Sequence, residues 1–534
     1  MTMGNFLENW IKTRPCARWF YPVWILFTAV VFLTAALMGG SFFWGYMCLL
    51  VLVIFMLRPS SWLHKKNLEN LTLIKRLFTL LVALITIAAC ILPMDMLPLW
   101  NGEVPGHRNQ YELMAENILA GRLDFAYGDE AGLLNLKNPY DPAERQATGV
   151  KYHWDHAFYD GHYYMYFGVM PVFLAFLPYR VLTGTALTTY HATQLFTALT
   201  IAGIFVLFDL LAKRFFKRLP YSVYLCLSVA FSAMSVWYAT AEPALYCTAI
   251  TAALALEVWS LYFFMRAVYV EKRENRQIFF AAIGALLGAL AFGCRPTIAL
   301  ANLLVIPMLI VFLKQRKVTV KLLGKLCLAA LPYALVAAGL MLYNYARFDD
   351  PFEFGQKYQL TVADQSQYSV ALNADTLLRV INDTLSNFFE RGKFTLAFPY
   401  FRTSSVIFNF PILLLGVGIC NVAVLKNMRY ARLLPFMIGL AVTVLAITAM
   451  DILWTPYLLE RYRMDIYFLL GLGCFLVIGF WYNTATAKQR IWLSSVVTVC
   501  CLLTVISAFL LCVQTIGNYY PGMVKDIAEQ LRLG

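Results

Sequence analysis

One carboxylate in this sequence is surrounded by aromatic residues. Asp155 lies in the segment KYHWDHAFYDGHYYMYF, directly before His156 and a few residues before Tyr163 and Tyr164. Aromatic rings stack on the C–H faces of sugars, and a carboxylate beside them can accept the proton of an attacking hydroxyl. The pattern therefore makes Asp155 the first candidate for a general base, with His156, Tyr163 and Tyr164 as candidate substrate contacts. A structural role for Asp155, as a cap or turn residue, is the alternative.

The same segment is rich in side chains that bind metal ions. It contains His153, Asp155, His156, Asp160 and His162. Their spacing matches no well-defined ligand motif. We therefore assign no metal ligand and no certain cofactor, and keep a divalent metal ion as the alternative.

Upstream, the segment QYELMAENILAGRL predicts a short amphipathic helix that ends before Gly121. Its apolar stripe consists of Tyr111, Met114, Ala115, Ile118 and Leu119, and its other face holds Asn109, Glu112 and Glu116. A helix on a membrane surface could present such carboxylates to a substrate. Glu112 is therefore a second catalytic candidate, and Asn109, Gln110 and Tyr111 are candidate substrate contacts. The alternative is the solvated face of a packing helix.

Two arginines stand where apolar runs are interrupted. Arg295 lies in FGCRPTIAL, and Arg461, followed by Tyr462, lies in LLERYRMDIYF. An ionisable residue at such a place is a functional candidate, and phosphate is a natural partner for a guanidinium. Glu242, between two apolar runs in AEPALY, joins this set. For Arg295 and Arg461, the alternative is an arginine that merely snorkels to the membrane interface.

A further polar and aromatic cluster follows an apolar run at 343–360. Within YNYARFDDPFEFGQKYQL, the candidate substrate contacts are Asn344, Arg347, Gln356 and Tyr358. Such a cluster beside a membrane could line a pocket or simply fix the fold of the loop.

The elements that must position these residues are membrane helices. The 534 residues are 60% hydrophobic and 14% charged, whereas soluble domains carry about 25% charged residues. Apolar runs of roughly 20 residues recur along the chain, and each is long enough to cross a bilayer as a helix. The net charge of +13 comes largely from Lys and Arg in short segments between these runs. This distribution follows the positive-inside rule of membrane proteins and indicates contact with membrane lipid. It argues against nucleic acid as a partner.

We expect an all-α polytopic membrane protein with about 13 transmembrane helices. They are predicted at 19–38, 41–57, 77–98, 188–212, 220–240, 243–265, 277–294, 297–313, 326–345, 403–425, 433–453, 464–482 and 491–513. The expected divisions are N-terminal helices (1–98), a first extracytoplasmic, catalytic loop (99–162), a transmembrane core (163–345), a second extracytoplasmic loop (346–402), C-terminal helices (403–513) and a tail (514–534). The apolar stretch 163–183 is expected to be interfacial, re-entrant or broken, because a full crossing would violate the charge rule. An amphipathic helix is expected in the second loop, around Leu377, Ile381 and Leu385.

These features together resemble the GT-C superfamily of integral-membrane glycosyltransferases. The resemblance rests on the long exterior loop with its QYELMAENILAGRL helix, on RPT between two helices and on ERY at an exterior helix end. It is closest to bacterial members similar to protein mannosyltransferases and lipid A aminoarabinose transferases. The family usually has an acidic residue or pair at the start of the loop helix, where this chain has Asn109 and Gln110. The resemblance therefore leaves open whether Asp155, Glu112 or Glu103 is the base.

The resemblance implies an inverting transfer of sugar from a polyprenyl-phosphate donor. Arg295 and Arg461 would be donor-phosphate ligands, and the acceptor would be a glycan, lipid or protein of the cell envelope. The expected location is the outer face of a bacterial plasma membrane. Two alternatives stay open: a transporter or flippase of lipid-linked saccharides, and a polymerase or ligase of lipid-linked glycans.

Overall fold

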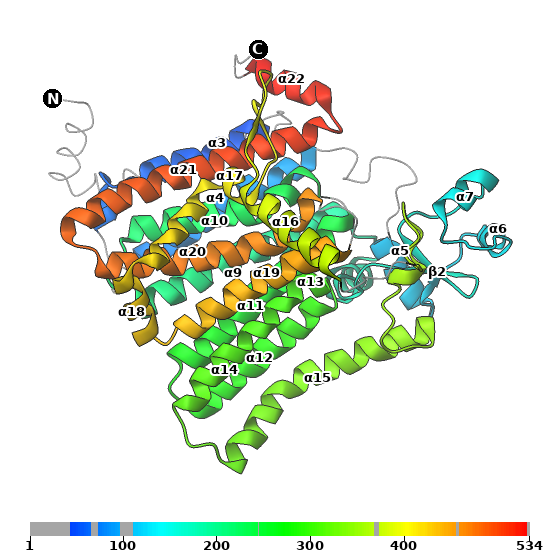
Figure 1. The fold of residues 1–534 in the computed structure, drawn as a ribbon, viewed down its shortest axis with the longest axis horizontal. Coiled ribbons are helices and arrows are strands. Elements are labelled where there is room, and N and C mark those ends of the chain that lie inside the picture. Colours follow the sequence, from blue (N-terminus) through cyan, green and yellow to red (C-terminus); the bar gives the residue numbers. More distant parts are fainter. Residues whose placement is uncertain are drawn as a thin grey trace.

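The computed structural model describes residues 43–65, 73–96, 110–243, 245–367, 373–454 and 459–530 (Figure 1). Within them, 10 helical segments are long and apolar enough to cross a membrane. These segments are built on α4 (Leu73–Ile91), α9 (Thr189–Phe215), α10 (Tyr221–Ala241), α11 (Leu245–Met265), α12 (Glu274–Phe292), the continuous run α13 (Pro296–Ala299), η6 (Leu300–Leu304) and α14 (Val305–Lys314), α15 (Val320–Phe348), α19 (Leu434–Trp454), α20 (Met464–Thr484) and α21 (Ala487–Gly517). The protein is a multi-pass helical membrane protein.

The expected number of about 13 spans is not reached by the described residues. They hold 10, or 11 if a bent pair is counted as one span. The predicted helix 19–38 lies outside the described residues, and the predicted helix 41–57 corresponds to the 14-residue α3 (Phe43–Met56). The other predicted spans, apart from 403–425, coincide with described helices to within a few residues at most ends.

The predicted membrane helix 403–425 is not one continuous helix. The chain instead forms α17 (Val406–Asn409), the 3-10 helix η8 (Pro411–Cys420) and α18 (Val422–Tyr430), and η8 and α18 are bent by 80°. The bend occurs at Asn421, whose side chain accepts a hydrogen bond from the Ala423 amide at 2.9 Å. An Asn that caps a new helix in this way stops the preceding one, because its backbone is extended rather than helical.

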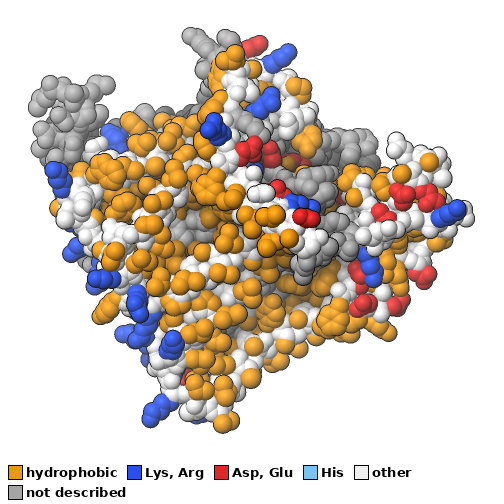
Figure 2. Space-filling view, in the orientation of Figure 1, with side chains coloured by type: hydrophobic (Ala, Val, Ile, Leu, Met, Phe, Trp, Pro, Cys, Tyr) orange, Lys and Arg blue, Asp and Glu red, His pale blue; other side chains and the backbone are white. Residues whose placement is uncertain are grey.

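Charge distinguishes the two ends of the helix bundle. Lys and Arg gather at the end where α14 meets α15 and α9 meets α10, and Asp and Glu gather at the opposite end (Figure 2). We call these the basic end and the loop end. By the positive-inside rule the basic end is expected to face the cytoplasm.

The loop predicted to be the first exterior loop folds into a small layer at the loop end (Figure 1). It comprises α5 (Gln110–Leu119), β1 (Asp124–Phe125), α6 (Glu130–Leu134), α7 (Pro142–Thr148), β2 (His156–Tyr159) and β3 (His162–Met165). The predicted loop helix is confirmed, with Gly121 in a left-handed conformation (φ 73°) just after its end. The three strands pair antiparallel in the order β1-β3-β2, a sheet that the sequence analysis did not predict.

The loop predicted to be the second exterior loop packs directly on the first. It contains η7 (Gln356–Tyr358), α16 (Ala374–Phe389), β4 (Lys393–Phe394) and β5 (Phe401–Arg402). The amide of Leu360 donates to the His156 carbonyl at 2.9 Å, and the buried Arg145 donates to the Thr361 carbonyl at 2.6 Å. The predicted amphipathic helix is α16, whose Leu377, Leu378 and Leu385 are each more than half exposed.

The segment 163–183 does not form a full span. After β3 it continues as η4 (Val172–Phe176) and α8 (Leu177–Thr183), a 12-residue apolar helix that is too short to cross a bilayer. It returns against the loop end of the bundle, where the Met170 amide donates to the Gly293 carbonyl at 3.1 Å. The prediction of an interfacial or re-entrant segment therefore fits its length and position.

Candidate functional site

Asp155 lies at the centre of a polar cluster at the loop end. It immediately precedes β2 and adopts a left-handed backbone conformation (φ 56°), which Asp and Asn tolerate better than most residues. The side chain is buried. Its two carboxylate oxygens accept hydrogen bonds from the hydroxyl of Tyr246 and from Nε2 of Gln359, the latter at 2.8 Å.

Backbone contacts from two other segments fix Asp155 in place. Its amide donates to the Leu360 carbonyl at 3.0 Å, and Nε2 of Gln110 donates to its carbonyl at 2.8 Å. Gln110 starts α5 and Leu360 follows η7, so both exterior loops converge on this residue. A residue held by two loops can be oriented for chemistry at little further entropic cost.

The surroundings of Asp155 act on its pKa in two opposite directions. Burial raises the pKa of the carboxyl above its ordinary value, while hydrogen bonds from Tyr246 and Gln359 and the charge of Arg461 act in the other direction. A raised pKa makes a carboxylate a stronger base. An ionised carboxylate accepts up to about four hydrogen bonds, so the donors Tyr246, Gln359 and Thr361 leave capacity for a substrate hydroxyl.

The side chain of Tyr246 contacts both this carboxylate and a cation. It is the second residue of α11, and the guanidinium carbon of Arg461, in η9 (Glu460–Arg463), lies 4.1 Å from the centroid of its ring. The hydroxyl of Tyr246 thus contacts Asp155 while its ring face contacts Arg461. Nearby Glu242, also buried, accepts a hydrogen bond from the Tyr238 hydroxyl at 2.6 Å.

Arg295 is held by a carboxylate. Its Nε donates to Oδ2 of Asp465 at 2.7 Å, and the Thr297 hydroxyl donates to the same oxygen at 2.7 Å. Its guanidinium also lies 5.0 Å from the ring centroid of Tyr462, and Asp451 is a further carboxyl group in its surroundings. The direct ion pair with Asp465 therefore already offsets the charge of Arg295.

Arg461 differs from Arg295 in this respect. Among the described residues, no Asp or Glu forms an ion pair with Arg461, which stacks on Tyr246 and has Tyr462 as its other aromatic neighbour, at 5.5 Å. A half-buried guanidinium that forms no direct ion pair keeps its hydrogen-bond donors available for an anion, although its charge also acts on nearby Asp155. Of the two predicted phosphate ligands, Arg461 has the more suitable surroundings.

His156 is neutral at ordinary pH. Burial lowers its pKa to about 4, so the ring carries no charge that could bind a phosphate at neutral pH. Its Nε2 lies 2.8 Å from the Tyr127 hydroxyl and its Nδ1 lies 3.4 Å from Nε2 of Gln110. His156 therefore helps to position α5 beside Asp155.

The candidate metal ligands point to different partners. His153 contacts Asp129 at 3.2 Å, and His162 contacts Asp124 at 3.2 Å. Within the part of the chain that the structure describes, no three His, Cys, Asp or Glu side chains are grouped so that they could hold a metal ion. The polar side chains of this segment are engaged in the sheet and its turns.

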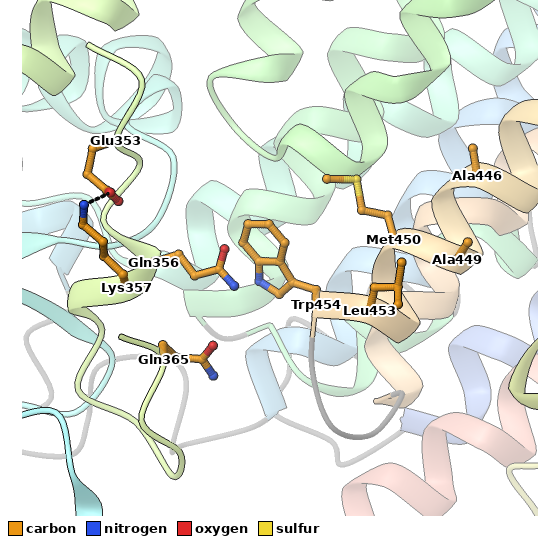
Figure 3. A pocket seen from close by; sticks show the side chains of 9 residues that line it. All are labelled: Glu353, Gln356, Lys357, Gln365, Ala446, Ala449, Met450, Leu453 and Trp454. Atoms are coloured by element: carbon orange, nitrogen blue, oxygen red, sulfur yellow. Dashed lines mark ion pairs between the residues drawn. The ribbon is translucent and has the colours of Figure 1, made fainter. Parts of the chain in front are cut away.

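A cavity of about 580 Å³ lies beside the cluster, between the second loop and the loop end of α19 (Figure 3). The predicted contact Gln356 lines it together with Gln365, facing Trp454 and Met450 of α19. The indole Nε1 of Trp454 donates to the hydroxyl of Tyr166 at 3.4 Å. Tyr166 in turn lies close enough to Asp155 for their charges to interact, so the cavity and the Asp155 cluster are neighbours.

The remaining cavity lining supplies polar contacts at one side only. Lys357 pairs with Glu353 at 2.9 Å at the side of the second loop, whereas α19 contributes Ala446, Ala449 and Leu453 (Figure 3). An apolar wall with an indole, facing amides and one ion pair, suits a ligand that carries both hydroxyls and C–H faces.

Several predicted contacts are packed into the protein instead. Tyr163 is fully buried and packs edge-on against Phe158. Arg347 is buried, donates to the Met165 carbonyl at 2.7 Å and to Asn344 Oδ1 at 2.8 Å, and so fastens α15 to β3. Tyr164 and Tyr358 both pack against Phe348.

The predicted site residues of the loop helix α5 also differ in how deeply they are buried. Gln110 is buried at Asp155, and Tyr111 is fully buried, with its ring stacked on Phe176 at 5.2 Å. Glu112 is half-buried, and because it is two residues from Gln110 on one helix it points in a different direction. Asn109 lies outside the described residues.

Sequence reasoning missed Tyr246, Gln359, Asp465 and Trp454. Two of them carried a usable signal: Asp465 is a carboxylate in an apolar run four residues after Arg461, and Tyr246 follows Glu242 by four residues. Gln359 and Trp454 carried none, because their role depends on how the loops fold. The sequence matches no known family model, and no curated protein matches it.

Proposed function

We propose that this protein is an inverting glycosyltransferase of the GT-C type. It moves a sugar from a polyprenyl-phosphate donor to a hydroxyl of a cell-envelope glycan, lipid or protein, on the outer face of the cytoplasmic membrane. The observation that carries the proposal is the placement of Asp155 and Arg461 on either side of Tyr246, a base and a cation at the loop end of a membrane bundle.

Each residue of this arrangement has a part in the transfer. The acceptor oxygen attacks the anomeric carbon and forms the new glycosidic bond, while the bond from that carbon to the phosphate oxygen breaks. Asp155 takes the proton of the acceptor hydroxyl. Arg461 stabilises the negative charge on the departing polyprenyl phosphate, as a positioned guanidinium does for a leaving phosphate group.

The cavity beside Trp454 is the proposed site of the acceptor. Its lining residue Trp454 contacts Tyr166, a neighbour of Asp155, and its indole and amide lining suits a sugar or another polyhydroxylated group. The donor phosphate is assigned to Arg461, which with Tyr462 directly precedes α20. In this proposal the base serves the acceptor and the cation serves the donor.

The carboxylates inside the membrane support a transferase over a transporter. Asp209 pairs with Lys213 at 2.5 Å near the basic end, and Asp451 interacts with the Arg295–Asp465 pair. Of the four carboxylates that stand within these apolar runs in the described part of the chain, this leaves Glu257 of α11. A translocation pathway needs a series of polar sites across the bilayer.

The test replaces Asp155 by Asn in cells that express the full chain. Asn tolerates the left-handed backbone of this position and fills the same volume, so the fold is retained while the base is removed. Mass spectrometry of envelope glycans, lipids and proteins should show a product with the wild-type chain that falls by roughly 10²- to 10⁴-fold with Asp155→Asn.

The matched control is Asp160→Asn. Asp160 is exposed, lies in the same loop and also has a left-handed backbone (φ 47°), so product should stay at the wild-type level. An Asp155→Asn chain that yields wild-type product would refute the assigned base. If no glycan, lipid or protein differs between cells with and without the wild-type chain, the proposed transfer is refuted.

A further inference from the structure

A second cavity, of about 430 Å³, lies between α11, α12, α14 and α15 toward the basic end. Its lining is mostly apolar and includes Ile278 and Ala285 of α12, Phe312 of α14 and Ala330 of α15. Along α12 the lining runs from Gln277 to Ala285, about 12 Å at 1.5 Å per residue. The cavity therefore extends from the membrane surface at the basic end into the apolar part of the bundle, far along the helices from Asp155.

The cavity opens sideways. Three of its lining residues, Leu303, Ile306 and Leu309, are between 38% and 51% exposed. All three lie within the apolar span Pro296–Lys314, whose exposed surface faces hydrocarbon in a bilayer. The occupant that such an opening admits is a lipid chain.

A concentration of positive charge lies at the basic end, where α14 meets α15 beyond this cavity (Figure 2). We call it the basic rim, and it consists of Lys314, Arg316, Lys317, Lys321 and Lys325. Arg316 and Lys325 share one carboxylate, that of Glu274, while Lys314, Lys317 and Lys321 are exposed. The rim therefore keeps an excess of positive charge.

Arg316 connects the rim to the cavity. Its guanidinium lies 4.3 Å from the ring centroid of Phe312 and donates a hydrogen bond to Oε1 of Gln277, and both of these residues line the cavity. Charge and apolar space are thus adjacent, at the depth where a lipid headgroup meets its chains.

We propose that this cavity binds one hydrocarbon chain of an anionic phospholipid, whose phosphate is held by the basic rim. The apolar lining fits the chain, and the rim selects a headgroup with net negative charge over a zwitterionic one. This site is separate from the proposed transfer and does not depend on it.

The test uses the full chain reconstituted in nanodiscs that contain phosphatidylglycerol or phosphatidylcholine, followed by native mass spectrometry of bound lipid. Wild-type protein should retain phosphatidylglycerol in preference to phosphatidylcholine. Ala330→Phe, which fills the cavity, and the double change Lys317→Glu with Lys321→Glu, which reverses charge on the rim, should each lower retained phosphatidylglycerol by roughly tenfold.

Two variants control for general effects. Ala338→Phe places the same ring on α15 outside the cavity lining, and Lys426→Glu with Arg429→Glu reverses the same charge on exposed residues of α18. Both should retain wild-type amounts of phosphatidylglycerol. The proposal fails if Ala330→Phe binds as much as wild type, if the α18 variant loses as much as the rim variant, or if both lipids bind equally. The rim variant keeps the test decisive if Ala330→Phe does not fold.

Discussion

The hydroxyl of Tyr246 donates a hydrogen bond to Asp155, and this favours the ionised form of that carboxyl. Burial acts against it and raises the pKa above the value of about 3.9 for an unperturbed Asp. A general base works only when it is deprotonated. Sugar transfer should therefore fall as the pH drops through a pKa that is higher than that of an ordinary aspartate.

Tyr246→Phe tests this coupling. The change removes the hydroxyl and keeps the ring against which Arg461 stacks, so the ionised form of Asp155 loses a donor and its pKa rises further. The acidic limb of the pH–rate profile, measured as transfer in membrane vesicles, should move to higher pH. Tyr159→Phe is the control, since its hydroxyl contacts Asp349 instead. A Tyr246→Phe profile that coincides with wild type would contradict the coupling.

The candidate site could be predicted in part at this scale. Asp155 stands out by its aromatic neighbours, and Arg295 and Arg461 stand out because charge is rare beside apolar runs. The sequence cannot show that Asp465 faces Arg295, 170 positions away, and so offsets its charge. Nor can it show that Tyr163 is buried, since an aromatic residue in a loop looks the same whether it binds a sugar or packs a small sheet.

At the scale of elements, the segment after β3 is fastened to the break between α12 and α13. A Cβ added at Gly168 would lie 2.3 Å from the Gly293 carbonyl oxygen and 2.4 Å from that of Cys294. The two backbones therefore approach as closely as they do only because residue 168 has no side chain. Arg295 directly follows Cys294. The close contact of Gly168 with the Gly293 and Cys294 carbonyls, which we call the joint, therefore positions Arg295 relative to the first loop.

Gly168→Ala should disturb this joint. The added methyl meets backbone atoms that cannot rotate away, and overpacking of this kind costs about 1–3 kcal/mol. We expect a lower midpoint of thermal unfolding in detergent and a reduced rate of transfer. Gly339→Ala in α15 provides the comparison, because a Cβ there meets nothing within 4 Å. Equal unfolding midpoints for the two variants would contradict the close approach.

Two elements show where prediction from sequence stopped. The hairpin of β2 and β3 was missed, although Asp160 and Gly161 at its turn form an Asp-Gly pair with left-handed backbone (φ 47° and 77°) between aromatic residues, a strong hairpin signal. The bend at Asn421 was missed because the apolar run continues through it. Hydropathy identifies apolar length, and it does not report a helix cap inside that length.

The whole molecule is polarised along the axis of its helices. Both exterior loops, the Asp155 cluster and the Trp454 cavity lie at the loop end, and the basic rim with its cavity lies toward the other (Figures 1 and 2). A polyprenyl-linked sugar is used on the side where nucleotide sugars are absent. The proposed transfer therefore requires the loop end to face outward, which is also the orientation that the positive-inside rule predicts.

Single cysteines test that orientation. Asp160 and Lys317 are exposed at the loop end and the basic end, respectively, and exposed Cys327 and Cys420 can be replaced by Ser to reduce background labelling. In intact cells, a membrane-impermeant maleimide should modify Asp160→Cys and leave Lys317→Cys unmodified until the cells are permeabilised. The same background without either new cysteine gives the baseline. If Lys317→Cys reacts in intact cells and Asp160→Cys is protected, Asp155 faces the cytoplasm, and a donor presented from the outer leaflet cannot reach it.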